Sequence, residues 1–153
     1  MLAGMSILLA LVLALGGAFG WPVAPPQVVR RFDPPAQPWL AGHRGVDLAG
    51  PPAAPVRSAG AGTVVFAGVI AGRGVVSVVH PGGLRSTYEP VTSTLHAGDT
   101  VARGQVLGTL AAGHPGCPVA ACLHWGLRRG ADYLDPLALL GLGPVRLLPL
   151  DAR

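Results

Sequence analysis

The sequence contains no lysine, so all eleven of its basic residues are arginines. Together with the abundant alanine, glycine and proline, this absence indicates a GC-rich genome rather than arginine-specific chemistry. Only 12% of the residues are charged, and the arginines are scattered apart from Arg30–Arg31 and Arg128–Arg129. A nucleic-acid-binding face needs a basic run or stripe, which is missing here. The net charge of +4 therefore indicates a different anionic partner, such as a wall polymer or a membrane surface.

Long helices are also excluded, because the 153 residues include 23 glycines and 16 prolines. Six of the prolines lie between Trp21 and Trp39, and they predict an extended, proline-rich lead-in over residues 21–41. Beyond Gly50 the chain consists of short apolar runs, several rich in β-branched residues, with glycine-containing turns between them. The expected strands are Thr63–Ala67, Val75–Val79, Leu84–Tyr88, Gln105–Leu110 and Leu123–Leu127.

The spacing of these runs, roughly ten residues, predicts an all-β fold, an antiparallel β sandwich or barrel-like domain with long loops. At most one short helix is expected, close to the C-terminus. Asp135 would cap its N-terminus and Pro136 would occupy its first position.

The N-terminus lacks basic residues before Ile7, yet Ile7–Leu15 is an uninterrupted apolar run. Small residues at Ala18 and Gly20 suit cleavage of a signal peptide covering residues 1–20. A retained membrane anchor is the alternative, although the run is short for a membrane span. We expect a secreted, extracytoplasmic protein.

Cysteine is scarce: Cys117 and Cys122 are the only two. An even number of cysteines in an oxidising compartment favours a disulfide between them. Because five positions separate the two residues, the closed loop would be small and its effect on stability modest.

Two short clusters carry residues suited to metal chemistry. The first, Gly42–Asp47, has glycines that indicate a loop or bent strand, and it offers His43 and Asp47 as an imidazole and a carboxylate. In the second cluster, a strand would place Cys122 and His124 on one face and the apolar residues between and after them on the other. Each cluster alone is a weak signal.

Taken together, the motifs of Gly42–Leu140 resemble the lysostaphin-type (LytM-like) zinc metallopeptidases in order and spacing. The matching segments are Gly42–Leu48, Pro55–Gly60, Gly62–Val64, Val78–Gly83, Thr87–Tyr88, Gly98–Val101, Gly104–Gly108, Leu123–Trp125 and Asp135–Pro136. The resemblance implies a murein endopeptidase domain over residues 42–141 and, with it, an association with the cell wall. Residues 142–153 would be a tail. The resemblance also implies one zinc ion held by His43, Asp47 and His124. Three protein ligands with one open position are typical of a catalytic zinc.

The chain departs from this family at both of its non-ligand histidines, which are replaced by Pro90 and Cys122. Those histidines handle the proton of the attacking water and stabilise the charge that develops on the substrate. Losing one such group costs about 10²–10⁴-fold in rate. As a thiolate, Cys122 would instead be a fourth zinc ligand that closes the site; a disulfide would prevent this.

Glu89 and His114 are the candidate substitutes for the missing histidines. Glu89 is a competent base, but in an extended strand it points opposite to Pro90, so we expect it to face away from the metal. His114 lies in a loop just before Cys117, close enough in sequence to reach the cleft. A structural role is expected for His80 and a surface position for His96.

Tyr88 and Arg128 are candidate substrate contacts, with ordinary packing and surface charge as the alternatives. The sequence leaves two functions open. One is a monomeric, exported zinc metalloendopeptidase that hydrolyses the peptide cross-links of bacterial peptidoglycan. The other is a catalytically degenerate zinc- or wall-binding module that acts as a scaffold or regulator of cell-wall hydrolysis. The intact ligand set favours the first, whereas Pro90 and Cys122 favour the second.

Overall fold

The computed structural model describes residues 18–142. The predicted signal peptide and tail therefore lie outside the described residues, apart from residues 18–20 and Leu142. Within the described part, no helix is long and apolar enough to span a membrane.

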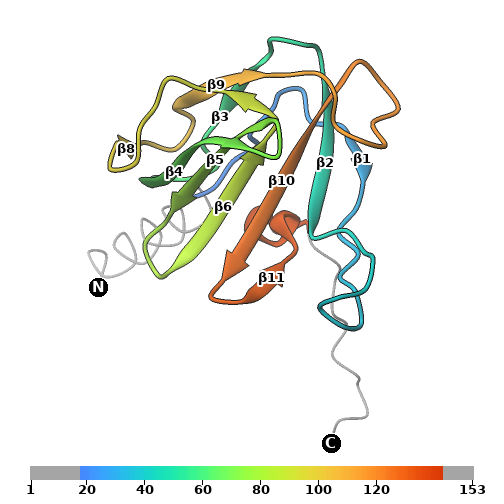
Figure 1. The fold of residues 1–153 in the computed structure, drawn as a ribbon. Coiled ribbons are helices and arrows are strands. Elements are labelled where there is room, and N and C mark those ends of the chain that lie inside the picture. Colours follow the sequence, from blue (N-terminus) through green and yellow to red (C-terminus); the bar gives the residue numbers. More distant parts are fainter. Residues whose placement is uncertain (1–17, 143–153) are drawn as a thin grey trace, which may run out of the picture.

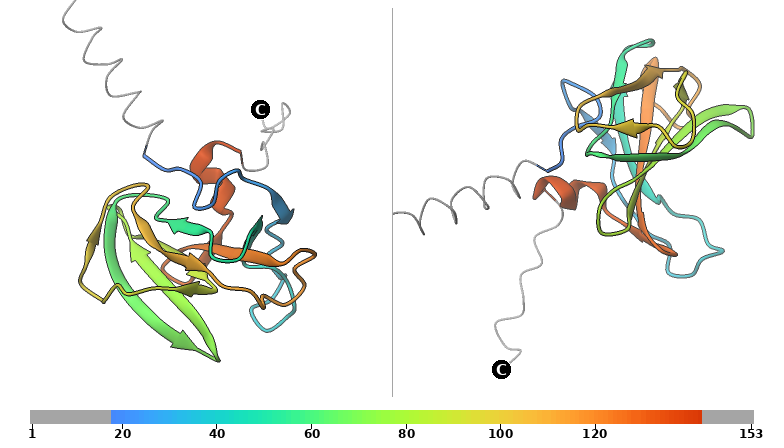
Figure 2. Two further views of the ribbon diagram at one scale, coloured as in Figure 1. Left: turned by 90° about the horizontal axis from the view of Figure 1, so that it is seen from above. Right: turned by 90° about the vertical axis from the view of Figure 1, so that its left-hand side faces the viewer.

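The described chain forms two antiparallel β-sheets (Figure 1), which confirms the all-β prediction. In spatial order, the large sheet contains β1 (Val28–Arg30), β2 (Gly45–Gly50), β10 (Ala121–Arg129), β6 (Leu84–Glu89), β5 (Arg73–Val79), β4 (Gly62–Ile70) and β8 (Thr100–Val101), with β11 (Asp132–Leu134) paired to the end of β10. The small sheet consists of β3 (Pro55–Arg57), β9 (Val106–Leu110) and β7 (Val91–Thr92). Figure 2 shows the two sheets from above and from the side.

Alternation along the central strands gives the large sheet one apolar and one polar face. In β10, Leu123 and Trp125 are buried, whereas His124 and Arg128 are partly exposed. The same alternation in β6 buries Ser86 and Tyr88 and leaves Arg85, Thr87 and Glu89 partly exposed. Because successive side chains of a strand point to opposite faces, the apolar face packs into the core and the polar face is available for a site.

The core lies between the large sheet's apolar face and the small sheet. Trp125 and Tyr88 are its largest side chains, and neither has any exposed surface. Leu107 and Leu110 of β9 reach the same cluster from the small sheet. The small sheet thus seals the core on the side opposite the polar face.

A chain of buried hydrogen bonds fixes Tyr88 within this core. The backbone N–H of Ala59 and the hydroxyl of Ser86 both donate to the Tyr88 hydroxyl, at 2.9 and 2.8 Å. His80 extends the chain through Nε2, 2.7 Å from the Ser86 hydroxyl, and its Nδ1 donates to the Ala61 carbonyl at 2.8 Å. His80 is therefore a structural residue, as the sequence predicts, and His96 is exposed.

The short helix expected near the C-terminus is present as a 3₁₀ helix, η1 (Pro136–Leu140). The carboxylate of Asp135 accepts a hydrogen bond from the N–H of Leu137 at 3.0 Å and so caps the helix. Gly141 ends it in the left-handed conformation, at φ 71°, where glycine lacks the Cβ penalty.

The proline-rich segment before the motif-bearing domain joins the large sheet at its edge. β1 pairs with β2 and places Arg30 opposite Asp47. Further along, Asp33 and His43 form an isolated antiparallel bridge, with N–H to carbonyl distances of 2.9 and 2.7 Å. This segment therefore supports the backbone on which His43 is carried.

Candidate metal centre

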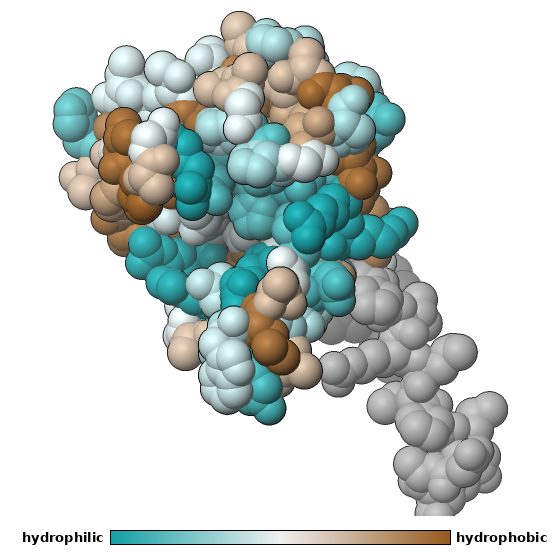
Figure 3. Space-filling view, turned by 45° about the vertical axis from the view of Figure 1, so that its right-hand side comes forward, coloured by the Kyte–Doolittle hydropathy of each residue, from teal (hydrophilic) through white to brown (hydrophobic). Residues whose placement is uncertain are grey.

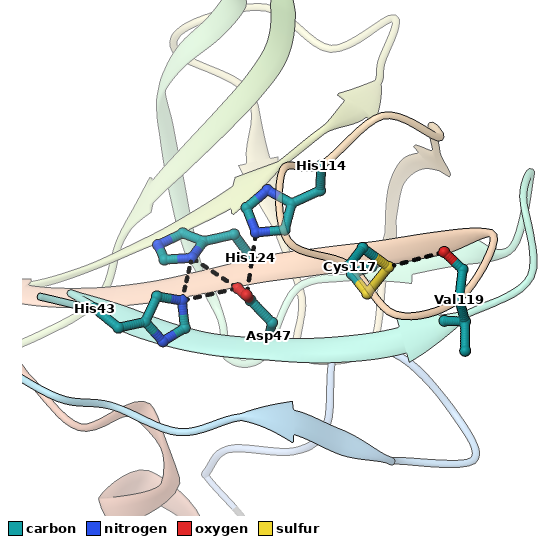
Figure 4. The surroundings of a disulfide bond; sticks show 7 residues. His43, Asp47, His114, Cys117, Val119 and His124 are labelled. Carbon is teal, nitrogen blue, oxygen red and sulfur yellow. Dashed lines mark hydrogen bonds and ion pairs between the residues drawn. A yellow bond between two sulfur atoms is a disulfide. The ribbon is translucent and has the colours of Figure 1, made fainter.

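Three residues on two neighbouring strands bring metal-binding atoms together. Asp47 lies on β2 and His124 directly opposite it on β10, while His43 precedes β2 by two residues. The candidate ligand atoms of these three residues all lie within 4.8 Å of one another, and His43 and Asp47 are buried. Figure 4 shows the three side chains converging on one point.

The spacing of the three atoms fits a single bound ion. His43 Nε2 and His124 Nδ1 each lie 3.0 Å from Asp47 Oδ1, and the two nitrogens are 3.2 Å apart. Zinc–nitrogen bonds of about 2.0–2.1 Å arranged tetrahedrally give ligand–ligand edges of roughly 3.3 Å. The donor set, two imidazoles and one carboxylate, is also one that zinc accepts. These residues therefore fit the metal that the sequence implies.

The ring of His43 is oriented by the chain that precedes it. Its Nδ1 lies 2.8 Å from the carbonyl oxygen of Arg31. Because a carbonyl can only accept, Nδ1 carries the hydrogen, and the lone pair of Nε2 is left facing Asp47. Such a second hydrogen bond is the usual way in which a protein fixes a ligating histidine.

The carboxylate of Asp47 is held in its charged form. Burial acts to raise its pKa, but the hydrogen bond with His124 and the nearby imidazoles of His114 and His43 outweigh burial. The net result is a pKa below the usual value of an aspartate. A buried anion beside several imidazoles suits a cation site.

The backbone of Gly45 lies directly against the imidazole of His124. A Cβ added at Gly45 would clash with the carbonyl oxygen of Trp125 and lie 2.8 Å from His124 Nε2. Only a residue without a side chain allows the imidazole to lie against β2 at this point. This requirement explains the first glycine of β2 in physical terms.

A disulfide joins Cys117 to Cys122, with Cα atoms 5.7 Å apart. The alternative of a Cys122 thiolate at the metal therefore does not apply to this structure. Cys122 lies on β10, two residues before His124 and on the same face of the sheet. The bond thus ties the loop of residues 111–120, here called the His114 loop, to the strand that carries a candidate ligand.

His114 reaches the metal centre from this tied loop. Its Nε2 lies 3.1 Å from Asp47 Oδ2, and its ring centroid is 5.7 Å from that of His124. The same Nε2 is buried and, among the described residues, has no partner in hydrogen-bond geometry, so the close approach to Asp47 is not an aligned bond. Figure 4 shows the imidazole above Asp47 and beside His124.

Glu89 faces the polar side of the sheet, contrary to the expectation from its neighbour Pro90. It is the direct partner of His124 across β6 and β10, and directly paired residues project from the same face. Its carboxylate, however, accepts a hydrogen bond from Arg73 Nε at 2.9 Å. Glu89 thus lines the site but is engaged in an ion pair with β5.

A groove of about 670 Å³ runs along the polar face and connects these residues. Its lining includes His43, His114, His124, Glu89, Arg85 and Arg128. In Figure 3 a band of hydrophilic residues crosses the visible face between hydrophobic patches. Arg128 therefore has the position expected of a substrate contact. Tyr88 does not have such a position. It points into the core and has no exposed surface, so its role is packing, the alternative that the sequence left open.

Comparison with known proteins relates the chain to a family of peptidases. The family model for Peptidase family M23 matches residues 41–136. The uncharacterized protein Rv2891 of Mycobacterium tuberculosis is 57% identical over 139 residues, which are 88% of this chain and 56% of the relative. The chain thus spans about half the length of the curated relatives it matches first.

Solved structures show the same fold. A zinc-containing peptidase from Vibrio cholerae aligns with a TM-score of 0.64 and 25% identity, over 80% of this chain and 39% of that one. Lysostaphin from Staphylococcus simulans aligns with a TM-score of 0.68 and 21% identity, over 82% of this chain and 54% of that one. The chain belongs to peptidase family M23, and the resemblance to lysostaphin-type proteins is confirmed.

Proposed function

We propose that the protein is a zinc metalloendopeptidase that hydrolyses the peptide cross-links of bacterial peptidoglycan. His43, Asp47 and His124 hold one zinc ion, which when bound supplies the Lewis acidity that polarises a scissile carbonyl and activates water. The observation that carries the proposal is the mutual spacing of their three ligand atoms, 3.0, 3.0 and 3.2 Å. Membership of peptidase family M23 supports peptidase chemistry independently of this spacing.

His114 performs the proton transfer that the family's missing histidines would perform. Its buried Nε2 lies 3.1 Å from Asp47 Oδ2 but makes no aligned hydrogen bond within the described residues, so a lone pair on this nitrogen can accept the proton released as water attacks the carbonyl. Glu89 is less suited, because its carboxylate is already paired with Arg73. His124 and Asp47, fixed on paired strands, keep the reacting groups in place.

Export completes the proposal. The apolar run Ile7–Leu15 would act as the core of a signal peptide over residues 1–20, and residues 42–141 would form the peptidase domain. Extracytoplasmic location supplies both the substrate and the oxidising conditions for the Cys117–Cys122 bond. Fusing residues 1–25 to a reporter that is active only outside the cytoplasm tests this point, and an inactive reporter would contradict it.

The competing function is a zinc- or wall-binding module without hydrolytic activity. It is favoured by the replacement of both family histidines, by Pro90 and Cys122. The test measures bound zinc and the release of new amino termini from purified peptidoglycan by the purified protein. His124→Ala removes a ligand, and His96→Ala is the matched control, because His96 is exposed and outside the groove lining.

Release of amino termini by the parent and His96→Ala, but not by His124→Ala, supports the peptidase. Stoichiometric zinc without release from any wall preparation would instead establish the binding module. Loss of zinc from His124→Ala alone, in either case, supports the ligand assignment.

A further inference from the structure

Two arginines lie directly opposite each other on the groove side of the large sheet. Arg85 of β6 and Arg128 of β10 are register partners, which places their Cβ atoms about 5 Å apart on one face. Like charges in such pairs destabilise a sheet. An anionic group bound between the two guanidinium groups would offset this repulsion.

Neither arginine is neutralised within the described part of the chain. The ion pairs found there join Asp47 to imidazoles and Arg73 to Glu89, and no carboxylate lies within 4.0 Å of Arg85 or Arg128. Both side chains are half-buried and line the groove. The pair thus presents unpaired positive charge to whatever occupies the groove.

Two other arginines of the groove are already engaged, whereas Arg30 lines the groove from β1 and is exposed. Arg44 donates to the carbonyl of Pro38 at 2.7 Å and lies over the ring of Tyr133, with 5.8 Å between guanidinium and ring centre. Arg73 is held by Glu89. Arg85 and Arg128 differ from Arg44 and Arg73 because they have no such partner in the described residues, and from Arg30 because they lie side by side as register partners.

The pair lies within reach of a peptide bound at the metal centre. Arg128 follows His124 by four residues on the same strand, which is about 13 Å at 3.3 Å per residue. An extended peptide covers this distance with about four residues. Because one groove is lined by both His124 and Arg128, a single peptide can contact both.

We propose that Arg85 and Arg128 form a carboxylate-binding subsite that selects peptides with a negatively charged group within about four residues of the bond that is cut. The guanidinium group is a planar fork of N–H donors that matches a carboxylate, and two of them can clamp one carboxylate from both sides. The proposal rests on the proposed function for the identity of the bond, and it adds the charge of the substrate. A neutral cross-link, such as a glycine bridge, is a poor substrate on this basis.

The test compares two synthetic peptidoglycan stem-peptide dimers, one with free carboxylates and one with the same carboxylates amidated. Binding to the purified zinc-loaded protein is followed by fluorescence anisotropy, and binding to His124→Ala is measured alongside it so that cleavage does not affect the result. We expect the charged dimer to bind about tenfold more tightly, which corresponds to about 1.4 kcal/mol. Arg85→Gln and Arg128→Gln should each remove most of this difference.

Arg129→Gln is the matched control, since it removes the same charge from the next residue, which is exposed and points away from the groove face. It should leave the preference unchanged. Neither Arg85→Gln nor Arg128→Gln should lower the melting temperature, because each relieves the repulsion within the pair. A fall in affinity accompanied by a stable fold is what distinguishes a binding role from a structural one.

Equal binding of the two dimers, or an equal loss in Arg129→Gln, would overturn the subsite. Displacement of the charged dimer by a peptide-free glycerol-phosphate polymer, to the same extent in the parent and in Arg128→Gln, would also overturn it, because general charge attraction would then account for binding. If the dimers are discriminated but never cleaved, the proposed peptidase fails and the subsite stands. If both are cleaved with equal kcat/KM, the subsite fails and the peptidase stands.

Discussion

The disulfide offers the sharpest test of how His114 is positioned. Replacing both cysteines, Cys117→Ala with Cys122→Ala, removes a bond that closes a loop of five residue steps. Loop-closure entropy for so short a loop corresponds to roughly 2 kcal/mol of unfolding free energy. In a domain of this size the melting temperature should fall by roughly 4–8 °C. The sheet itself should remain folded, because the core is built from residues outside the His114 loop.

The effect on catalysis should be much larger than the effect on stability. Without the disulfide, the His114 loop is joined to β10 only through the backbone at Ala121, and the imidazole spends less time beside Asp47. We expect kcat on a cross-linked peptide to fall toward that of His114→Ala, a loss of about 10²–10⁴-fold. Zinc content should stay near one per chain, since His43, Asp47 and His124 are untouched.

A combined variant decides whether the two losses share a cause. If the disulfide acts only by placing His114, then removing both cysteines in a His114→Ala background should lower kcat no further. Dithiothreitol should slow the parent and leave the cysteine-free variant unaffected. Full kcat in His114→Ala with normal zinc content would refute the role of His114. Full kcat in the cysteine-free variant alone would refute the role of the tie.

Three further predictions concern the scaffold around the site. Tyr88→Phe leaves the N–H of Ala59 without its buried acceptor, so urea titration should show a loss of about 1–3 kcal/mol in unfolding free energy; no loss would contradict the network. Burial lowers the pKa of His80 in the folded protein, although its backbone hydrogen bond acts to raise it. As the pH falls below 6.5, the pKa of a histidine in the unfolded chain, the unfolded state therefore takes up the proton first and the stability of the fold declines. Urea titrations of the metal-free protein at pH 7.5 and 5.5 should show a smaller decline in His80→Gln than in the parent, and equal declines would count against this cause. Gly45→Ala pushes a methyl group against His124, so its zinc affinity, measured by chelator competition, should fall. Gly68→Ala, on β4, is the control and should keep the parent's affinity. Equal affinities of the two variants would show that a glycine is not required at position 45.

Much of the fold was predictable because the long strands carry clear patterns. The runs at Val75–Val79 and Leu84–Tyr88 are bounded by turn residues and rich in β-branched or alternating side chains, and the structure extends each by only one or two residues. Strand β2 was harder to assign, because glycines stand at both of its ends and five of its six residues are buried, which removes the alternation. The two- and three-residue strands depend on tertiary pairing and have no local signature.

The site was predictable where motif spacing fixes it and unpredictable where a loop path does. His43, Asp47 and His124 converge because β2 and β10 pair, whereas the approach of His114 depends on the course of residues 111–120. The available signal was the closeness of His114 to Cys117 and of Cys122 to His124. Strand alternation relative to Pro90 gave the wrong orientation for Glu89. Only the cross-strand register shows that Glu89 lies on the same face of the sheet as His124.

The origin of each imidazole implies an order of maturation for the site. The candidate ligands arrive when the large sheet forms, because His124 and Asp47 are register partners. The disulfide that ties the His114 loop to β10 forms in a separate chemical event, which needs its own oxidant and has its own rate. On the proposed function, a newly made chain can therefore fold and bind metal before His114 is held beside Asp47. The folding of the sheet and the completion of the proposed site would then be two distinct steps, separated by the formation of one disulfide.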